Sequence, residues 1–295
     1  MKLAIDWDVR PELIEGWKTP NMYGLLFVAG LIIGYFVIMK IFKKENISAE
    51  ILDKLVMYMV FAIIVGARLG HVLFYGPHFD VKNADGVVLE RGYFSHPFDI
   101  VKVWEGGLAS HGATIAIILV LWWFSKKISK KPILWILDRI SISAAITACF
   151  IRLANLVNSE IVGDITTVPW GFRFFQNSED LNNFYNFGVP IPIRHPTQLY
   201  EAIVYFLIFV LLLFMYWKKE AWKKAGLLFG TLLVSVFTAR FFIEFLKLGQ
   251  SDWDQKLTIN TGQMLSIPFV IVGFYVIWKA LKNQQIDDFE KVNEK

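Results

Sequence analysis

The stretch Ile-Arg-Leu-Ala-Asn-Leu-Val-Asn-Ser-Glu-Ile-Val-Gly, residues 151–163, directly follows the apolar run 140–150. If that run spans a bilayer, the polar side chains begin where the hydrocarbon core ends. On a helix Arg152 and Asn155 share a face, and Glu160 could return to Arg152 from beyond the helix end. Such a cluster could hold a buried anion. The same residues could instead end a helix and face water, and their spacing leaves both interpretations open.

The composition decides the broad class of protein. The chain has 295 residues, 55% of them hydrophobic, and a mean hydropathy of +0.47, which predicts an integral membrane protein. The single cysteine, Cys149, excludes an internal disulfide framework and lies in an apolar run, where packing is its commoner role. The net charge of +4 is small, so no nucleic-acid partner is predicted. Four acids and no compact apolar core precede Met22, so no cleavable signal peptide is expected.

Seven segments of about 20 residues are long and apolar enough to cross the hydrocarbon as helices. They are residues 22–41, 55–75, 108–124, 133–156, 197–217, 226–248 and 261–281. We therefore predict an all-α fold with seven transmembrane helices in a single polytopic domain, residues 1–295. The long links 76–107 and 157–196 are expected to form a small head.

Lysines gather in alternate links between these segments. They are Lys43, Lys44 and Lys54 in the first link, Lys126, Lys127, Lys130 and Lys131 in the third, and Lys218, Lys219, Lys223 and Lys224 in the fifth. The positive-inside rule places such links in the cytoplasm. The N-terminus and both long links are therefore predicted outside, with Trp104 and Trp170 as interface anchors, and the C-terminus inside.

Polar residues inside or beside membrane spans are costly and tend to mark function. Here they gather at the predicted outward ends of the spans: Tyr23, Arg68, His71, His111, Arg152, Asn155, Glu160, Arg194, His195, Gln198, Tyr200, Glu201, Arg240 and Glu244. We predict that they line one polar pocket that opens toward the outer leaflet. Guanidinium groups bind phosphate bidentately, so Arg152, Arg240 and a possible third, Arg68, suit a phosphate ligand. Arg240 and Glu244 could instead form an internal ion pair, because they are four residues apart.

His111 lies in the glycine-rich stretch Trp-Glu-Gly-Gly-Leu-Ala-Ser-His-Gly-Ala, residues 104–113. The glycines allow the close backbone approach that a lipid headgroup would need. A neutral imidazole could take a proton from a nucleophile near neutral pH. A histidine at a helix start is also common as a capping or interface residue, so the motif alone leaves both roles open. No cluster with metal-ligand spacing and no Gly-x-Ser-x-Gly elbow is present, so neither a metal site nor a serine hydrolase is predicted.

These motifs resemble those of the prolipoprotein diacylglyceryl transferases of bacterial inner membranes. Their signature is Gly-Arg-x-Gly-Asn-Phe-x-Asn-x-Glu-x-x-Gly, of which this chain keeps Arg152, Asn155, Asn158, Glu160 and Gly163. The resemblance extends along the chain to Tyr23-Gly24, Ala67 to Gly70, Val72 to Tyr75, Gly106 to Gly112, His195 to Glu201, Arg240 with Glu244, and Gly262 to Pro268. The ordered set is far more specific than any one of its members.

Several positions depart from the family pattern. Ile151, Ala154 and Leu156 replace two glycines and a phenylalanine of the signature, and Ala113 replaces a glycine after His111. Val236 stands where the family usually has a tyrosine, four residues before Arg240. A direct chemical role for that tyrosine hydroxyl is therefore in doubt in this chain.

The resemblance implies transfer of the diacylglyceryl group of phosphatidylglycerol to the lipobox cysteine of a prolipoprotein signal peptide, with release of glycerol phosphate and without a cofactor. It implies a multi-pass protein of the bacterial inner membrane, embedded in the bilayer, with its active site on the periplasmic side. A thiol with a pKa of about 8.5 reacts as the thiolate, so a base or a positive field is needed. We expect His111 to assist deprotonation, although the arginine field alone could lower the thiol pKa and leave His111 a positioning role.

The other site residues take roles around this reaction. Arg152 and Arg240 are expected to hold the phosphate and to stabilise the departing phosphate ester. Asn155, Glu160 and Glu244 would orient these arginines, and Tyr23 and Gly163 would contact the substrate. A supporting set completes the site: Arg68, His195, Gln198 and Glu201.

Two other classes of protein fit a polar cavity in a helical bundle. A seven-helix receptor or light-driven pump would need a mid-span ligand site, and the retinal version needs a lysine deep in the seventh span. The nearest lysine there is Lys279, at the predicted cytoplasmic end. A lipid transporter should show broken helices or related halves, which the sequence does not suggest. The transferase is therefore the favoured interpretation.

Overall fold

The computed structural model describes residues 4–14, 20–83, 85–103, 106–175, 177–248 and 259–282. The predicted anchor Trp104 lies outside these residues. The contacts divide the chain into two compact units, which are described separately below. The first unit comprises residues 1–40 and 137–295, and the second comprises residues 41–136. The single domain predicted from the sequence therefore stays a prediction.

Seven helices among the described residues are long and apolar enough to cross a membrane, as the hydropathy predicts. They are α1 (Met22–Lys44), α2 (Ala49–Phe74), α3 (Ser110–Phe124), α4 (Ile133–Val157), α6 (Thr197–Lys218), α7 (Leu227–Ile243) and α8 (Thr261–Lys282). The π-helical turn η3 (Ser125–Ser129) extends α3, the 3-10 turn η5 (Glu244–Leu246) extends α7, and η4 (Ala221–Lys223) precedes α7. The seven-helix membrane fold is confirmed, and the side of the membrane that each end faces stays a prediction.

The second helix begins earlier than predicted, at Ala49 and not at residue 55. Its added turn buries Leu52 completely. On the opposite face Lys54 donates a hydrogen bond to Glu50, one turn away. Because Glu50 and Lys54 are charged, they lower the hydropathy of this turn, and hydropathy alone therefore placed the start of the helix too late.

Large apolar side chains remain exposed along the middle of these helices. Phe61 is 65% exposed, Leu119 60% and Ile271 63%. Exposing so many apolar groups to water would cost free energy, whereas lipid chains solvate them. The exposed surface therefore agrees with a multi-pass membrane protein.

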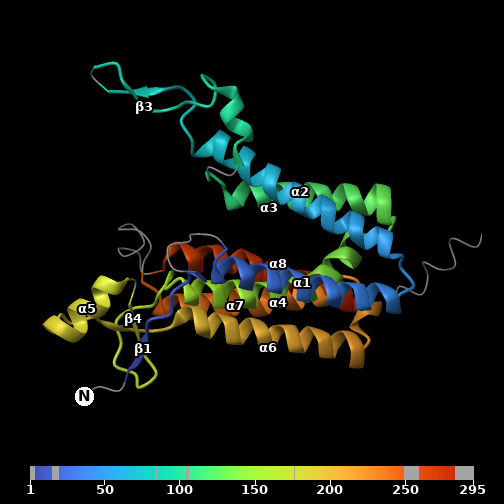
Figure 1. Cartoon of the computed structure of the whole chain (residues 1–295). Helices are drawn as coiled ribbons and strands as arrows, with labels where there is room; N and C mark the ends of the chain where they lie inside the picture. The colour runs from blue at the N-terminus through green and yellow to red at the C-terminus, as the bar shows by residue number, and fades with distance from the viewer. Residues whose placement is uncertain are drawn as a thin grey trace, which may run out of the picture. The chain divides into compact units, whose positions relative to one another are not determined.

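In the first unit α1, α4, α6, α7 and α8 run side by side (Figure 1). Helices α1 and α4 approach closely at two glycines: a methyl group on Gly30 would lie 2.8 Å from Phe150 Cβ, and one on Gly34 would lie 2.2 Å from Ser143 Oγ. Thr147 Oγ1 donates a hydrogen bond to the Gly30 carbonyl over 3.1 Å. Small residues allow this contact because the two backbones can then come close enough for direct bonding.

The N-terminal end of α7 is fixed by the carboxylate of Asp138 on α4. Asp138 is completely buried and accepts hydrogen bonds from the backbone N–H groups of Gly226 and Phe229, over 2.7 and 2.8 Å. These donors belong to the first turn of α7 and have no partner within that helix. Asp138 therefore has a structural role at the end of the bundle opposite the arginine cluster described below.

A small mixed sheet covers one end of the first unit, where the sequence predicted only loops. Strand β1 (Ile5–Trp7) pairs in parallel with β4 (Phe172–Phe174), and β4 pairs antiparallel with β5 (Ile193–Arg194). The short helix α5 (Ser178–Phe187) follows β4 and ends at Gly188, whose positive φ of 66° suits glycine. Trp7 packs on Phe172 and donates to the Leu156 carbonyl over 3.0 Å. The N-terminal strand is thereby attached to the end of α4, next to Arg152.

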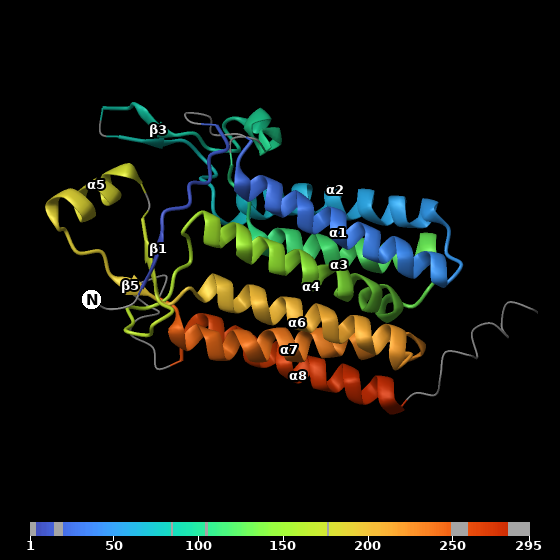
Figure 2. The same cartoon turned by 60° about the horizontal axis from the view of Figure 1, so that its bottom comes forward.

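The second unit is built on the antiparallel pair α2 and α3, which lie side by side in both views (Figure 2). A methyl group on Gly112 would lie 2.1 Å from the Gly66 carbonyl oxygen and 2.7 Å from Gly70 Cα, so the helices touch backbone to backbone. The link between them carries the hairpin of β2 (Val81–Lys82) with β3 (Val88–Glu90) and the 3-10 turn η1 (Pro97–Val101). This contact fixes the start of α3, where His111 lies.

Candidate functional site

The first unit contains a buried ion pair between α4 and α6. Arg152 Nε lies 3.0 Å from Glu201 Oε2. The Glu201 side chain is completely buried and that of Arg152 is 15% exposed. A buried carboxylate is stable only beside a cation, so each residue requires the other. Glu201, which we predicted in a supporting position, therefore contacts Arg152 directly.

A second cation reaches the same carboxylate. Lys247 Nζ lies 2.9 Å from Glu201 Oε1 and 3.3 Å from Glu244 Oε2. The Lys247 side chain is only 4% exposed. Our sequence analysis did not single out Lys247, although a lysine three residues after Glu244 at the end of a span is a recognisable signal.

The alternative of an internal ion pair between Arg240 and Glu244 is wrong. Glu244 pairs with Lys247, and among the described residues Arg240 forms no ion pair. Arg240 is half-buried on α7 and, like Arg152, lies near the buried Tyr205 of α6. Tyr205 is four residues after Glu201, a spacing that places both on one face of α6. Among the described residues, the guanidinium of Arg240 is therefore available to a ligand.

The polar residues at the end of α4 and just after it form a chain of hydrogen bonds. Arg152 Nη1 donates to Asn155 Oδ1 over 3.5 Å, and Asn155 Nδ2 donates to Glu160 Oε1 over 2.9 Å. Asn158 Nδ2 also donates to Glu160 Oε1, over 3.4 Å. Glu160 therefore returns to Asn155, and its link to Arg152 runs through that amide. The expectation of a direct return to Arg152 is not met.

Backbone strain accompanies this return of Glu160. Its neighbours Ser159 and Ile161 have φ angles of 53° and 61°, which residues other than glycine rarely adopt. The start of α6 holds the strained turn: Thr197 Oγ1 donates to the Ile161 carbonyl over 3.0 Å, and Gln198 Nε2 donates to the Glu160 carbonyl over 2.6 Å. Such strain persists only where the surroundings enforce it, and it is common at functional sites.

Gly163 and His195 lie beside the cluster for a steric reason. A methyl group on Gly163 would lie 2.6 Å from His195 Cβ and 2.6 Å from the Leu246 carbonyl oxygen. The backbone N–H of Gly163 donates to the His195 carbonyl over 2.9 Å. His195 Nδ1 lies 3.2 Å from the Tyr200 hydroxyl. Glycine is thus required at position 163 for close packing. This steric requirement explains Gly163 without the substrate contact that we predicted, and that contact stays a prediction.

Three buried oxygen atoms of the cluster lack a hydrogen-bond donor among the described residues. They are Gln198 Oε1, Glu201 Oε2 and Glu244 Oε2. Glu201 Oε2 faces Arg152 and Glu244 Oε2 faces Lys247 at ion-pair distance, so a cation compensates each of these two carboxylate oxygens. Gln198 Oε1 has neither a hydrogen bond nor an ion pair among the described residues, and a buried acceptor of this kind is costly.

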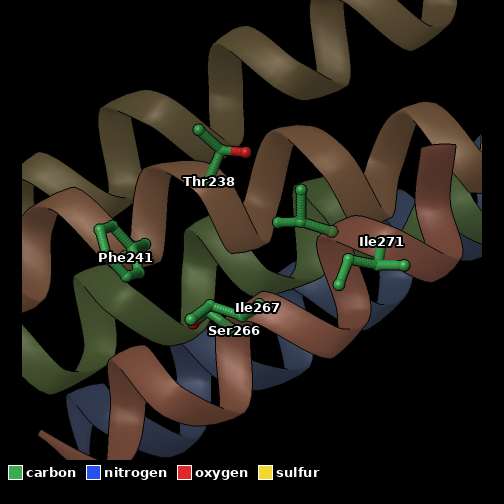
Figure 3. Close-up of a pocket in the computed structure, with 6 residues that line it drawn as sticks. Thr238, Phe241, Ser266, Ile267 and Ile271 are labelled. Atoms are coloured by element: carbon green, nitrogen blue, oxygen red, sulfur yellow. The ribbon is translucent and has the colours of Figure 1, made fainter. Parts of the chain in front are cut away.

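An apolar groove of about 250 Å³ runs between α7 and α8 (Figure 3). It is lined by Thr238, Phe241, Ser266, Ile267, Val270 and Ile271. Phe241 follows Arg240 in the chain, and Ser266 Oγ donates to the Gly262 carbonyl, beside which the Glu244 carboxylate packs. The groove is therefore next to the charged cluster and has the apolar lining that a hydrocarbon chain requires.

Tyr23 begins α1 in the same unit and is half-buried. Among the described residues its hydroxyl contacts no member of the cluster, so its predicted contact with a headgroup stays a prediction.

In the second unit, Arg68 organises the glycine loop that precedes His111. Its guanidinium donates to the carbonyls of Ile100, Gly106, Gly107 and Asp99, the first over 2.8 Å and the second over 2.6 Å. The side chain is buried and stacks on Tyr93, 5.1 Å from the ring centre. Its donors are therefore used on backbone carbonyls, and the possible third phosphate-binding arginine has a structural role.

The loop itself carries a local ion pair. Lys102 Nζ lies 2.5 Å from Asp99 Oδ1, and this hydrogen bond lowers the pKa of the Asp99 carboxyl below its usual value. Burial opposes the shift without cancelling it. The turn that supplies two carbonyls to Arg68 is thereby held by a second contact.

His111 lies exposed at the start of α3 with an aromatic partner from the end of α2. Its Nδ1 lies 3.3 Å from the Tyr75 hydroxyl, and the two rings stack with centres 6.5 Å apart. The His71 ring is also stacked with Tyr75, and Tyr93 meets His71 edge-on. Tyr75 appeared in our sequence analysis only as the end of a motif, because no sequence spacing reveals that it faces His111.

The structure thus brings Arg152, Asn155, Glu160, Glu201 and Glu244 together in the first unit. It places His111 and Arg68 in the second unit. The predicted pocket that combines His111 with the arginines joins residues of both units, so it stays a prediction.

Comparisons with known proteins show the family of this chain. A family model described as prolipoprotein diacylglyceryl transferase matches residues 14–279. A protein of Porphyromonas gingivalis is 43% identical over 286 residues, which cover 95% of each chain, and one of Chloroherpeton thalassium is 40% identical over 96% of this chain and 97% of its own. A protein of Tolumonas auensis is 40% identical over 94% of this chain and 98% of its own. All three are named phosphatidylglycerol-prolipoprotein diacylglyceryl transferase. The chain therefore belongs to the prolipoprotein diacylglyceryl transferase family.

Proposed function

We propose that this protein transfers the diacylglyceryl group of phosphatidylglycerol to the thiol of a lipobox cysteine in a prolipoprotein. The thiolate sulfur attacks the glyceryl carbon that carries the phosphate ester, a carbon–sulfur bond forms, and the carbon–oxygen bond to phosphate breaks. Glycerol phosphate leaves with the electron pair. The observation that carries the proposal is the half-buried Arg240 without an ion-pair partner among the described residues, beside the buried pair of Arg152 and Glu201.

In this mechanism the arginines bind the phosphate. Arg152 uses Nε toward Glu201 and Nη1 toward Asn155, and its remaining donors bind the phosphate together with Arg240 of α7. Charge builds on the phosphate ester as its carbon–oxygen bond breaks, and fixed cations in a poorly hydrated site stabilise that charge. Glu201 and Lys247 hold the geometry in place before the substrate arrives.

The headgroup glycerol of phosphatidylglycerol carries hydroxyl groups that can donate hydrogen bonds to the site. Gln198 Oε1 is a buried acceptor without a hydrogen-bond donor among the described residues. A glycerol hydroxyl is one donor that could satisfy such an acceptor. Tyr23 adds a further contact to the headgroup.

The acyl chains lie against the apolar surface beside the cluster. The groove between α7 and α8 begins next to Arg240 and Glu244, so one lipid can place its phosphate on the arginines and a hydrocarbon chain along Phe241 and Ile267. Such a lipid would reach the site sideways from the bilayer.

His111 accepts the thiol proton in this mechanism. The thiol has an ordinary pKa of about 8.5, so a neutral imidazole beside it increases the fraction of reactive thiolate. The active site then faces the periplasm from the inner membrane, on the side where the positive-inside rule places the outward links.

The direct test is to incubate the purified protein with phosphatidylglycerol and a lipobox peptide and to weigh the peptide. A gain of one diacylglyceryl group supports the transferase. Lipid movement between leaflets without a gain in peptide mass would favour a transporter. If neither outcome is observed, the receptor is the remaining alternative. A peptide with serine in place of the lipobox cysteine is the matched control and should gain no mass.

A further inference from the structure

Tyr75 is the one side chain among the described residues that hydrogen-bonds the imidazole of His111. The Tyr75 hydroxyl lies 3.3 Å from His111 Nδ1, and the two rings stack at an angle of 21°. This contact uses one ring nitrogen of His111 and leaves Nε2 as the nitrogen that can face another molecule. The tautomer of a histidine is set by the hydrogen bond that its second nitrogen makes.

We infer that Tyr75 is a positioning residue that keeps the proton of His111 on Nδ1 and the lone pair on Nε2. A phenol oxygen can accept a hydrogen bond as well as donate one. When it accepts the Nδ1–H of the imidazole, Nε2 is free to take a proton from a thiol. Without this acceptor a neutral imidazole prefers to carry its proton on Nε2, where it cannot act as a base. The inference rests on the base role of His111 in the proposed function.

The backbone of Tyr75 is anchored at the end of α2. Tyr75 forms the C-terminal cap of α2, and its backbone N–H donates to the His71 carbonyl over 2.9 Å. The His71 ring lies parallel to the Tyr75 ring at an angle of 8°, with centres 6.3 Å apart. Tyr93 meets His71 edge-on and lies beside Arg68. The phenol itself is 62% exposed, and its hydroxyl reaches His111 from this anchored position.

The backbone of α3 holds His111 at a matching position. His111 precedes Gly112, whose backbone touches Gly66 and Gly70 of α2. Both partners of the hydrogen bond therefore come from one helix pair that is packed backbone to backbone. A residue that positions a catalytic group should be rigid in this way, because small displacements weaken proton transfer.

The test is a nitrogen NMR measurement on the full-length protein with labelled histidine, at a pH well above the ordinary imidazole pKa of about 6.5. The chain has five histidines, and the signal that disappears in His111→Gln belongs to His111. We expect the wild-type His111 to be protonated at Nδ1 and Tyr75→Phe to move the proton to Nε2. An unprotonated Nδ1 in the wild-type protein would overturn the inference, and so would wild-type signals in Tyr75→Phe.

Activity provides the second readout. Loss of one hydrogen bond should lower kcat of Tyr75→Phe about fivefold and leave KM for phosphatidylglycerol unchanged. Tyr93→Phe is the matched control, since it removes a nearby hydroxyl that makes no hydrogen bond among the described residues, and it should change neither kcat nor the His111 signals. A raised KM with an unchanged kcat in Tyr75→Phe would contradict a positioning role. Full activity of His111→Gln would instead contradict the base role in the proposed function, while the NMR result would still decide the tautomer.

Discussion

Lys247 Nζ lies 2.9 Å from Glu201 Oε1, and both side chains are buried. Arg152 approaches the other oxygen of the same carboxylate. Glu201 therefore links a cation of α4 to a cation at the end of η5. The arginine proposed to bind the phosphate thus depends on a group that is not expected to touch the phosphate.

Replacing Glu201 by glutamine should destabilise the protein strongly. Glu201→Gln leaves Arg152 and Lys247 without their shared counter-charge, and breaking a buried ion pair costs about 3–5 kcal/mol. The midpoint of thermal unfolding in detergent measures this loss. Glu220→Gln is the control: Glu220 pairs with Lys223 at the surface with 59% exposure, and its loss should cost less than about 1 kcal/mol. Equal midpoints for the two variants would contradict the importance of the buried pair.

Lys247 should be needed for its charge. Lys247→Met leaves the Glu201 and Glu244 carboxylates facing each other, and we expect the transfer rate to fall at least about tenfold while Lys247→Arg keeps most of it. The double variant Lys247→Met with Glu244→Gln should recover part of the lost stability, because it also removes a negative charge. Additive losses in the double variant would show that the two residues do not interact.

Arg152→Lys tests the bidentate binding of phosphate. Lysine keeps the positive charge but loses the planar fork, so KM for phosphatidylglycerol should rise about tenfold. Arg240→Lys should have an effect of the same kind. Initial rates over a range of phosphatidylglycerol concentrations in mixed micelles measure it. Full retention of phosphatidylglycerol turnover in both variants would count against a guanidinium fork on the phosphate.

His111→Gln tests the proton acceptor. Loss of a general base should lower the rate of thioether formation about a hundredfold and change its pH profile, with little effect on lipid binding. The rate is measured on a lipobox peptide across a range of pH. An unchanged rate and an unchanged profile would remove His111 as the base and would favour the arginine field as the source of the thiolate.

Arg68→Lys should loosen the glycine loop without unfolding the helices. Lysine cannot donate to all four carbonyl oxygens that bind the guanidinium, so hydrogen exchange should accelerate in residues 99–103 and 106–109 and stay slow in α2 and α3. Activity should fall because His111 follows this loop. Exchange that is unchanged in the loop, with a raised KM for phosphatidylglycerol, would indicate that Arg68 binds the lipid after all.

Much of the fold follows from the sequence because a bilayer imposes simple rules. A crossing helix needs a long apolar segment, and the seven segments with the required hydropathy are the seven long helices of the structure. The strands β1, β4 and β5 were not predicted, since each has two or three residues and their pairing joins segments that are far apart in the chain. Short runs of that kind have no periodicity to recognise.

The candidate site was only partly predictable. Polar residues at span ends identified Arg152, Asn155, Glu160, Arg240 and Glu244, because such residues are too costly in a membrane to be kept without use. Their pairing could not be read from spacing: Glu244 faces Lys247 and not Arg240, and Glu201 reaches Arg152 from another helix. Pairing of this kind depends on how the helices pack, which the spacing of residues in the sequence does not predict.

The central claim is that the phosphate of one lipid headgroup binds at the cluster around Arg152 and Arg240. A phosphatidylglycerol analogue with a photoreactive group on its headgroup glycerol, followed by mass spectrometry of the digested protein, tests this claim most directly. The account predicts labelled peptides from the segments around Arg152 and Arg240, with both labels suppressed by excess phosphatidylglycerol. The absence of suppressible labelling from both segments would contradict it.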